Sequence, residues 1–218
     1  MEPTAIHVPV LADEVTHLLR ARRPGWMVDG TVGLGGHAER LLDASAPGAR
    51  LLGLDGDADA LAQAGARLAR FGERAVLRHG SFRRLGSHAA GAGVTEAESV
   101  LLDLGLSSYQ LEASRRGFTF QGDEPLDMRF DATQGPTAAE LVNTLPEAEL
   151  ARILFEHGEE PHARRIARRI VEARASAPLR TTGELVARLV LDAGEGAEGG
   201  ELDLQPPVEL LRLRARRA

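Results

Sequence analysis

Three aspartates in the first half of the chain follow short apolar runs, a position from which a carboxylate can serve a binding site. Asp29 ends the run in "GWMVDGT", Asp55 ends "RLLGLD", and Asp103 ends "SVLLD". Such a carboxylate accepts hydrogen bonds from ribose hydroxyls, attracts an ammonium group and repels phosphate oxygens. A single aspartate of this kind is most simply explained as a helix cap, but three beside a glycine-rich loop favour a site for a positively charged nucleoside.

The glycine-rich loop directly follows Asp29 and has four glycines within the seven residues from Gly30 to Gly36. Its stretch Gly33-Leu-Gly35-Gly-His-Ala38 matches the loose G-x-G-x-x-G/A pattern of dinucleotide binding. Two cofactors compete for this pattern, a nicotinamide dinucleotide and S-adenosylmethionine, and either would use Asp55 for its ribose. Asp29 favours S-adenosylmethionine, because that molecule carries an ammonium group and no pyrophosphate.

The elements that must position these residues alternate along the first half of the chain. Strands are expected at 25–31, 50–55, 75–80 and 99–105, and helices at 10–19, 34–44, 57–71 and 82–90. Strands separated by helices form βαβ units, with a parallel sheet and right-handed crossovers. The sequence therefore predicts an α/β fold with Asp103 at the topological switch point, where ligands bind in such sheets.

The second half of the chain has a different pattern. A long stretch with little periodicity, 107–136, is followed by helical patterns at 137–145, 146–158, 162–175 and 181–191. From Asp192 the composition becomes rich in glycine and acidic residues, which is typical of a flexible linker, and the chain ends in "VELLRLRARRA". We therefore expect three parts: a core at 1–106, a loop and helical insertion at 107–191, and an acidic linker with an Arg-rich tail at 192–218.

Composition excludes several classes of protein. The net charge of -6 excludes a globally basic nucleic-acid binder, although all 26 basic residues are Arg and a local basic face remains open. The absence of Cys excludes disulfides and thiolate metal sites. No run of 18 apolar residues and no secretory signal pattern is found, so the expectation is a cytoplasmic protein with no membrane partner and no metal.

Several blocks of the sequence resemble a known family. The blocks are "HVPVLADEV", "DGTVGLGGH", "LDGD", "LLDLGLSSYQLE", "RRGFTFQGDEPLDMRFD", "TAAELVN", "GEEPHARRIARRIVEAR" and "RTTGEL", which run in order from about His7 to about Val190. Together they resemble the bacterial 16S ribosomal RNA cytosine-N4 methyltransferases, the RsmH/MraW family. The resemblance implies a class I methyltransferase fold, meaning a Rossmann-like parallel sheet, here with a helical insertion. It also implies S-adenosylmethionine as cofactor and N4-methylation of a cytidine in the decoding region of the small ribosomal subunit.

Carried over by motif position, the resemblance assigns roles to individual residues. It implies that the glycines and the histidine of the loop line the methionine end of the cofactor, that Asp55 binds the ribose and that Phe82 lies by the adenine. The full cofactor set that it implies is Gly35, Gly36, His37, Asp55, Phe82, Asp103 and Gln110.

Methylation of a cytosine amine needs a group that accepts hydrogen bonds from that amine, because its lone pair is delocalised into the ring. Asp103, or a carbonyl group in the 104–108 turn, could accept these bonds. Ser107 is a second candidate, and it can equally cap the turn that follows. Tyr109 can stack on a flipped base or pack in a core. The reaction needs no metal.

Basic residues for RNA binding are expected on one of the later helices. Arg164 and Arg168 lie at i, i+4 spacing, where they form either a phosphate-binding face or an ordinary solvated face. In the context of the family, three more candidates join them: Arg115, Arg116 and Arg129.

The chain departs from the family pattern after about Leu191. The later strands of the family are not recognisable, so the C-terminal strands of the sheet are expected to be missing. Two alternatives to an active methyltransferase follow. One is a truncated, inactive remnant that binds RNA or cofactor, and the other is a nicotinamide-dependent oxidoreductase, which only the glycine spacing favours.

Overall fold

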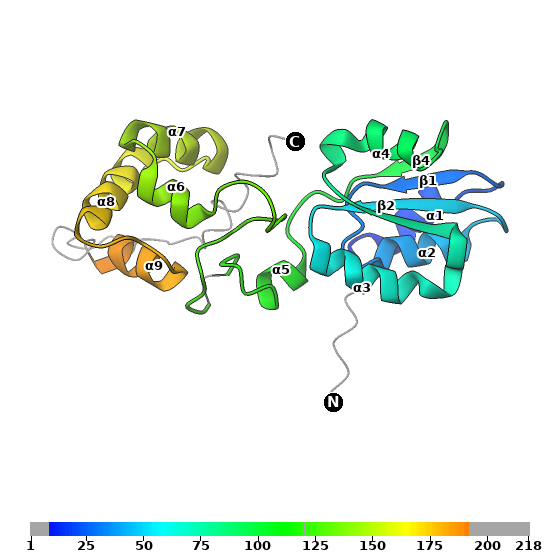
Figure 1. Ribbon diagram of the computed structural model, residues 1–218, viewed down its shortest axis with the longest axis horizontal. Coiled ribbons are helices and arrows are strands. Elements are labelled where there is room, and N and C mark those ends of the chain that lie inside the picture. Colours follow the sequence, from blue (N-terminus) through cyan, green and yellow to red (C-terminus); the bar gives the residue numbers. More distant parts are fainter. Residues whose placement is uncertain (1–8, 120, 192–218) are drawn as a thin grey trace, which may run out of the picture. The chain divides into compact units, whose positions relative to one another are not determined.

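The computed structural model describes residues 9–119 and 121–191, and the chain divides into two compact units, Met1–Leu104 and Gly105–Ala218. Figure 1 shows the ribbon of both units. The linker and tail expected at 192–218 lie outside the described residues.

The first unit is built on four strands: β1 (Trp26–Asp29), β2 (Arg50–Asp55), β3 (Ala75–His79) and β4 (Ala97–Leu101). All strand pairs are parallel and the order is β3-β2-β1-β4. This confirms the predicted α/β fold with a parallel sheet. Because β1 lies between β2 and β4, the chain reverses its direction of travel across the sheet at β1, and the carboxyl ends of β1 and β4 border the topological switch point.

Three helices connect these strands, α2 (Gly36–Ala44), α3 (Ala58–Leu68) and α4 (Leu85–Gly91), together with the 3₁₀ turns η1 (Ala69–Arg74) and η2 (Phe82–Arg84), and a further helix, α1 (Ala12–Leu19), precedes β1. Helix α3 begins where the sequence indicates, because the Asp57 carboxylate accepts hydrogen bonds from the backbone N–H groups of Asp59 and Ala60. Helix α2 begins at the end of the glycine-rich loop, so the loop lies between the end of β1 and the first turn of a helix.

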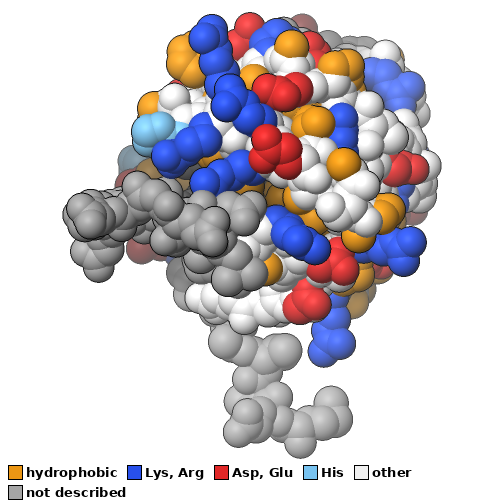
Figure 2. All heavy atoms as spheres, turned by 90° about the vertical axis from the view of Figure 1, so that its left-hand side faces the viewer, with side chains coloured by type: hydrophobic (Ala, Val, Ile, Leu, Met, Phe, Trp, Pro, Cys, Tyr) orange, Lys and Arg blue, Asp and Glu red, His pale blue; other side chains and the backbone are white. Residues whose placement is uncertain are grey.

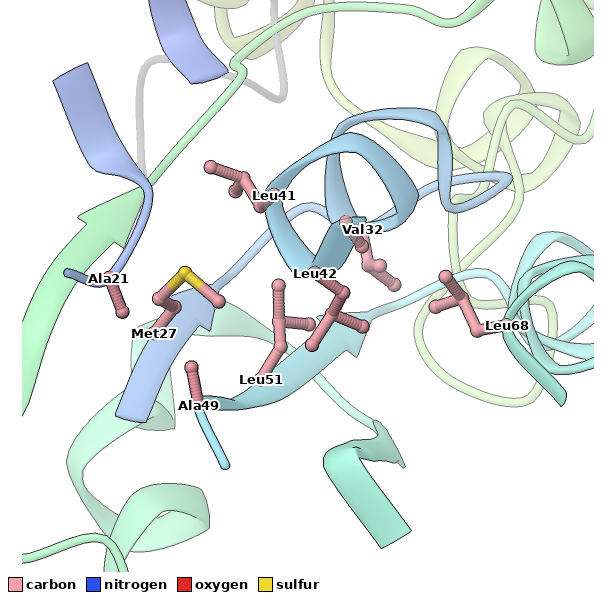
Figure 3. Packing of buried hydrophobic residues seen from close by; sticks show 9 residues of the cluster. Ala21, Met27, Val32, Leu41, Leu42, Ala49, Leu51 and Leu68 are labelled. Carbon is pink, nitrogen blue, oxygen red and sulfur yellow. The ribbon is translucent and has the colours of Figure 1, made fainter. Parts of the chain in front are cut away.

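The main core of this unit lies on one face of the sheet. Met27 and Leu51 of the central strands pack against Leu41 and Leu42 of α2 and Leu68 of α3 (Figure 3). Each of these five side chains is almost fully buried, and burial of one such side chain contributes about 1.5–3 kcal/mol. This layer fixes the carboxyl ends of β1 and β2 against the glycine-rich loop.

The opposite face has a smaller core. Val28, Leu52 and Leu54 are buried there, with Leu85 and Ala89 from the α4 segment packed on them. Val100 of β4 is in register with Val28 and therefore lies on this face, but 47% of it is exposed. The apolar surface of this face thus continues to the edge of the sheet, where the described residues leave it uncovered.

The two edges of the sheet differ in character. The β3 edge ends in Arg78 and His79, both exposed, and a charged residue such as Arg78 protects an edge strand from pairing with another chain. The β4 edge carries Glu98, paired with Arg23, near its start, and continues into Leu102 and Leu104, which are 44% and 57% exposed. Among the described residues, the β3 edge is therefore protected by charge, and the β4 edge is apolar and unpaired at its carboxyl end.

The second unit is helical: α5 (Ser108–Glu112), α6 (Ala138–Thr144), α7 (Glu147–Gly158), α8 (Ala163–Ser176) and α9 (Thr182–Leu191). The four helices predicted after residue 136 are present, and α5 is a short helix within the stretch that the sequence predicts as loop. Its core joins Leu150 and Leu154 of α7 to Ala167 and Ile170 of α8. None of the helices in the described part of the chain is long and apolar enough to cross a membrane.

The open edge generates a prediction. Replacement Val100→Lys should weaken concentration-dependent self-association, because a charge on an edge strand opposes pairing with a second chain. The free energy of unfolding should change by no more than about 0.5 kcal/mol, since the side chain is half exposed. Sedimentation velocity over a range of concentrations measures the association.

The matched control is Arg78→Val at the other edge, which removes a protecting charge and should strengthen association. If Val100→Lys and the unmodified chain sediment identically at concentrations where the unmodified chain associates, the β4 edge is not the surface through which the chain self-associates.

Candidate functional site

The carboxyl end of β1 holds a buried carboxylate. Asp29 is 1% exposed; its Oδ1 accepts a hydrogen bond from the Thr31 backbone N–H at 3.0 Å, and its Oδ2 has no hydrogen-bond partner among the described residues. Burial raises the pKa of Asp29 to about 7; the Thr31 backbone N–H opposes this rise, and the negative charges of Asp55 and Asp103 add to it. A buried carboxylate oxygen without a partner is costly, and a cationic ligand would satisfy it.

The carboxyl end of β2 is tied to the glycine-rich loop. The Asp55 carboxylate accepts the Gly33 backbone N–H on Oδ2 at 2.7 Å and the Asp57 backbone N–H on Oδ1 at 2.8 Å. Burial raises the pKa of Asp55, although these two backbone hydrogen bonds act in the opposite direction. Each carboxylate oxygen keeps a further lone pair, so the same side chain can hold the loop and accept a ligand hydroxyl.

The loop follows a path that only glycine permits. A Cβ on Gly30 would lie 2.5 Å from Leu102 Cδ2 and 3.1 Å from Phe82 Cβ, and one on Gly36 would lie 2.6 Å from Pro9 Cγ. Gly33 and Gly35 have φ values of +51° and +82°, in the left-handed region. The loop backbone is therefore packed closely against its surroundings at the strand ends, and Phe82 stands beside Gly30 there.

Asp103 completes the group of acids just after β4. It is half exposed, and its Oδ2 lies 3.6 Å from Nε2 of His37, which is buried at the start of α2. The Asp103 backbone N–H donates to Thr31 Oγ1 at 2.7 Å. The structure thus brings Asp29, Asp103 and His37 together around Thr31. Our sequence analysis missed Thr31, although a hydroxyl residue between the glycines of this loop was a readable signal.

In the second unit, Ser107 and Gln110 form a helix cap. Ser107 Oγ accepts the Gln110 backbone N–H at 3.2 Å, and Gln110 Oε1 accepts the Ser107 backbone N–H at 2.9 Å. This reciprocal arrangement is a capping box at the start of α5. The capping role considered for Ser107 from sequence is therefore present, and Tyr109, in the first turn of α5, is partly buried.

Two of the candidate RNA-binding arginines hold the long loop of the second unit. Arg129 donates to Asp127 Oδ1 from Nε at 2.8 Å and to Asp127 Oδ2 from an Nη at 2.6 Å, and this pairing lowers the pKa of Asp127. Arg116 donates to the backbone carbonyls of Arg129 and Phe130. Arg115 is exposed and has a φ of +51°. A phosphate would compete with Asp127 for Arg129, whereas Arg115 points its charge to solvent.

Helix α8 carries the more accessible positive charges. Arg164 and Arg165 are exposed, and Arg168 is 66% exposed, with only a 4.0 Å contact to Glu147. Ala163, Ala167 and Ile170 lie on the buried side of the same helix. Arg side chains gather on one side of the helical unit in the space-filling view (Figure 2).

The helical unit also contains an apolar cavity of about 320 Å³. Its walls come from α6, α7, α8, α9 and the loop that precedes α6, and they include the two aromatic rings Phe118 and Phe130, whose centroids lie 5.4 Å apart. Arg152 and His157 are the basic residues of the lining.

Comparison with known proteins places this geometry in a family. Residues 4–195 match the model described as "MraW methylase family". The chain belongs to the MraW methylase family. The family resemblance predicted from the sequence is thereby confirmed.

Members of the MraW methylase family with high similarity are named ribosomal RNA small subunit methyltransferase H. One from Syntrophotalea carbinolica is 53% identical over 190 residues, 87% of this chain and 60% of the relative. One from Heliobacterium modesticaldum is 46% identical over 197 residues, 89% of this chain and 63% of the relative. The chain spans about three fifths of the length of these curated relatives.

Solved structures are more distant. The crystal structure of an rRNA methylase from Streptococcus thermophilus is 22% identical, with a TM-score of 0.35 over 48% of this chain and 57% of that one. The fold described above rests on the strand order and the parallel register instead.

The close packing of the loop generates one prediction. Gly30→Ala should lower the free energy of unfolding by about 1–3 kcal/mol, because its Cβ overlaps Leu102 and Phe82. Gly56→Ala, where nothing lies within 4 Å of the added Cβ, is the control and should change stability by less than about 1 kcal/mol. Urea denaturation measures both variants, and equal stabilities would show that the end of β1 has room for a side chain.

The buried Asp29 generates a second prediction. Because its pKa rises from 3.8 to about 7 in the folded chain, its contribution to stability is full below pH 3.8 and is lost as the pH rises through about 7. From pH 5 to pH 8 the unmodified chain should therefore lose about 1–3 kcal/mol more stability than Asp29→Asn, which does not titrate. The free energy of unfolding of both chains is measured by denaturation across this pH range. If it changes with pH in the same way in both chains, Asp29 is already ionised at pH 5 and the prediction is wrong.

Proposed function

We propose that this chain acts as an S-adenosylmethionine-dependent methyltransferase on the N4 amine of a cytidine in 16S ribosomal RNA of the small subunit. The observation that carries the proposal is the buried Asp29 oxygen without a partner, at the glycine-rich loop, in a chain of the MraW methylase family. The names of the relatives, which act on small-subunit ribosomal RNA, support the substrate class. The proposal places the chain in the cytoplasm, where ribosomes are modified.

The residues at the strand ends fit this cofactor. Asp29 would attract its ammonium group, Asp55 would accept its ribose hydroxyls, and Phe82 would lie by its adenine. The remaining members of the proposed site are the loop residues Gly35, Gly36 and His37, with Asp103 and Gln110. A nicotinamide dinucleotide fits less well, because its pyrophosphate would face the Asp29 carboxylate.

S-adenosylmethionine supplies a methyl group on a sulfonium, which an amine takes by in-line displacement. The chain's own contribution is to hold the amine and to favour charge on its nitrogen. Asp103 is half exposed beside the glycine-rich loop, so its carboxylate can accept a hydrogen bond from an amine N–H and draw electron density onto the nitrogen. Ser107 is used in the cap of α5, so we favour Asp103 for this role.

The positive face of α8 would bind the phosphates of the RNA. Arg164 and Arg168, joined by Arg165, are exposed on one helix, and each phosphate contact releases counterions, so that binding weakens as salt rises. Arg115 is a further exposed candidate, whereas Arg116 and Arg129 would serve mainly by shaping the loop. Tyr109 remains our candidate for stacking on the base.

Calorimetric titration tests the cofactor. S-adenosylhomocysteine should bind and NAD should not, and Asp55→Ala should weaken binding by roughly 1–3 kcal/mol, since a charged acceptor is lost. Asp59→Ala, which removes another acid of the same region that the site does not use, is the control. Tighter binding of NAD would overturn the methyltransferase proposal in favour of an oxidoreductase.

The substrate is tested by incubating the chain with tritiated S-adenosylmethionine and small ribosomal subunits that lack the modification. The chain is assayed alone and joined to the remaining residues of the Syntrophotalea carbinolica relative. Label on a cytidine N4 that disappears in Asp103→Ala supports the proposal. Label on another atom contradicts it, and cofactor binding without transfer by either form would identify a binding remnant instead.

A further inference from the structure

We propose that Thr31 is a positioning residue of this site: its side chain fixes the segment after β4 against the glycine-rich loop, so that Asp103 is held across the crevice from Asp29. The proposal deepens the proposed function, because the ligand that these residues serve is S-adenosylmethionine.

Thr31 stands where backbone pairing between β1 and β4 ends. The Gly30 backbone N–H donates to the Leu101 carbonyl at 2.9 Å, just after the last paired residues of the two strands. The next anchor is from the Asp103 backbone N–H to Thr31 Oγ1, at 2.7 Å. The Thr31 side chain thus extends the hydrogen-bonded connection between β1 and β4 two residues beyond the last paired residues of the two strands.

This anchor decides where the Asp103 carboxylate can reach. Leu102, Asp103 and Leu104 are all exposed, so burial holds this segment less firmly than it holds the strands, although Leu102 packs beside Gly30. With the Asp103 backbone fixed by Thr31, Asp103 Oδ2 lies 3.6 Å from His37 Nε2. The hydroxyl therefore sets the distance between the end of β4 and the start of α2.

Thr31 acts on Asp29 as well. Its backbone N–H donates to Asp29 Oδ1 at 3.0 Å, and this bond lowers the pKa of Asp29. The same residue thus contacts Asp29 through its backbone and Asp103 through its side chain. The β-branched side chain also has few χ1 rotamers, which keeps the hydroxyl in place.

The experiment compares Thr31→Val, which keeps the shape, with Thr31→Ser, which keeps the hydroxyl. S-adenosylhomocysteine affinity is measured by calorimetry from pH 6 to pH 8.5. Thr31→Val should weaken binding about tenfold at pH 7, and Thr31→Ser should stay within about threefold of the unmodified chain. Thr16→Val, which removes a hydroxyl that bonds within α1, is the matched control and should leave affinity unchanged.

A second measurement needs no ligand. Hydrogen exchange at the Asp103 amide, followed by NMR in the free chain, should speed up in Thr31→Val and remain slow in Thr31→Ser and Thr16→Val, because only the first loses the acceptor.

The outcomes separate the two proposals. Unchanged affinity and unchanged Asp103 exchange in Thr31→Val would overturn the positioning role while leaving the methyltransferase proposal intact. If Thr31→Ser loses affinity and slow Asp103 exchange to the same extent as Thr31→Val, the hydroxyl alone does not set these properties, which would also overturn the positioning role. Failure of the unmodified chain to bind S-adenosylhomocysteine at any pH, with the exchange pattern as expected, would overturn the proposed ligand but retain the anchor.

Discussion

A carboxylate buried at the end of the central strand is the constraint on which the site depends. Asp29 is held by one backbone hydrogen bond and is otherwise enclosed, and a buried charge of this kind is stable only with a compensating partner. The loop presents the Thr31 N–H to it directly after Gly30, where a side chain would overlap Leu102 and Phe82. The remaining acceptor capacity, with Asp55 and Asp103 nearby, makes the crevice attractive to cations.

Much of this arrangement could be predicted from the sequence, because it follows from local pattern. The strand 50–55 and the helix start at Asp57 were marked by an apolar run and a capping aspartate, and three aspartates at strand ends pointed to the crevice. The contacts that cross between elements could not be predicted in this way. The bond from the Asp103 N–H to Thr31 joins residues 72 positions apart, and no period or spacing encodes it.

The arginines show the same limit. Sequence distinguishes a cation from a neutral residue, but not whether the charge faces solvent or a carboxylate. Arg129 is clamped by Asp127 and Arg116 holds backbone carbonyls, whereas Arg164 and Arg165 on α8 remain exposed. Arginines in the family blocks therefore divide into those that shape the helical unit and those that can meet a polyanion.

The unlike edges of the sheet have a consequence for symmetry. Pairing of the β4 edge of one copy with the β3 edge of another would be heterologous and could repeat without closing, as in a filament. Arg78 opposes that mode, because it places a charge on the β3 edge. Pairing between the β4 edges of two copies would instead be related by a two-fold axis and would leave no β4 edge for a third copy. Of the two modes, the charge on the β3 edge therefore disfavours the one that could grow into a fibre.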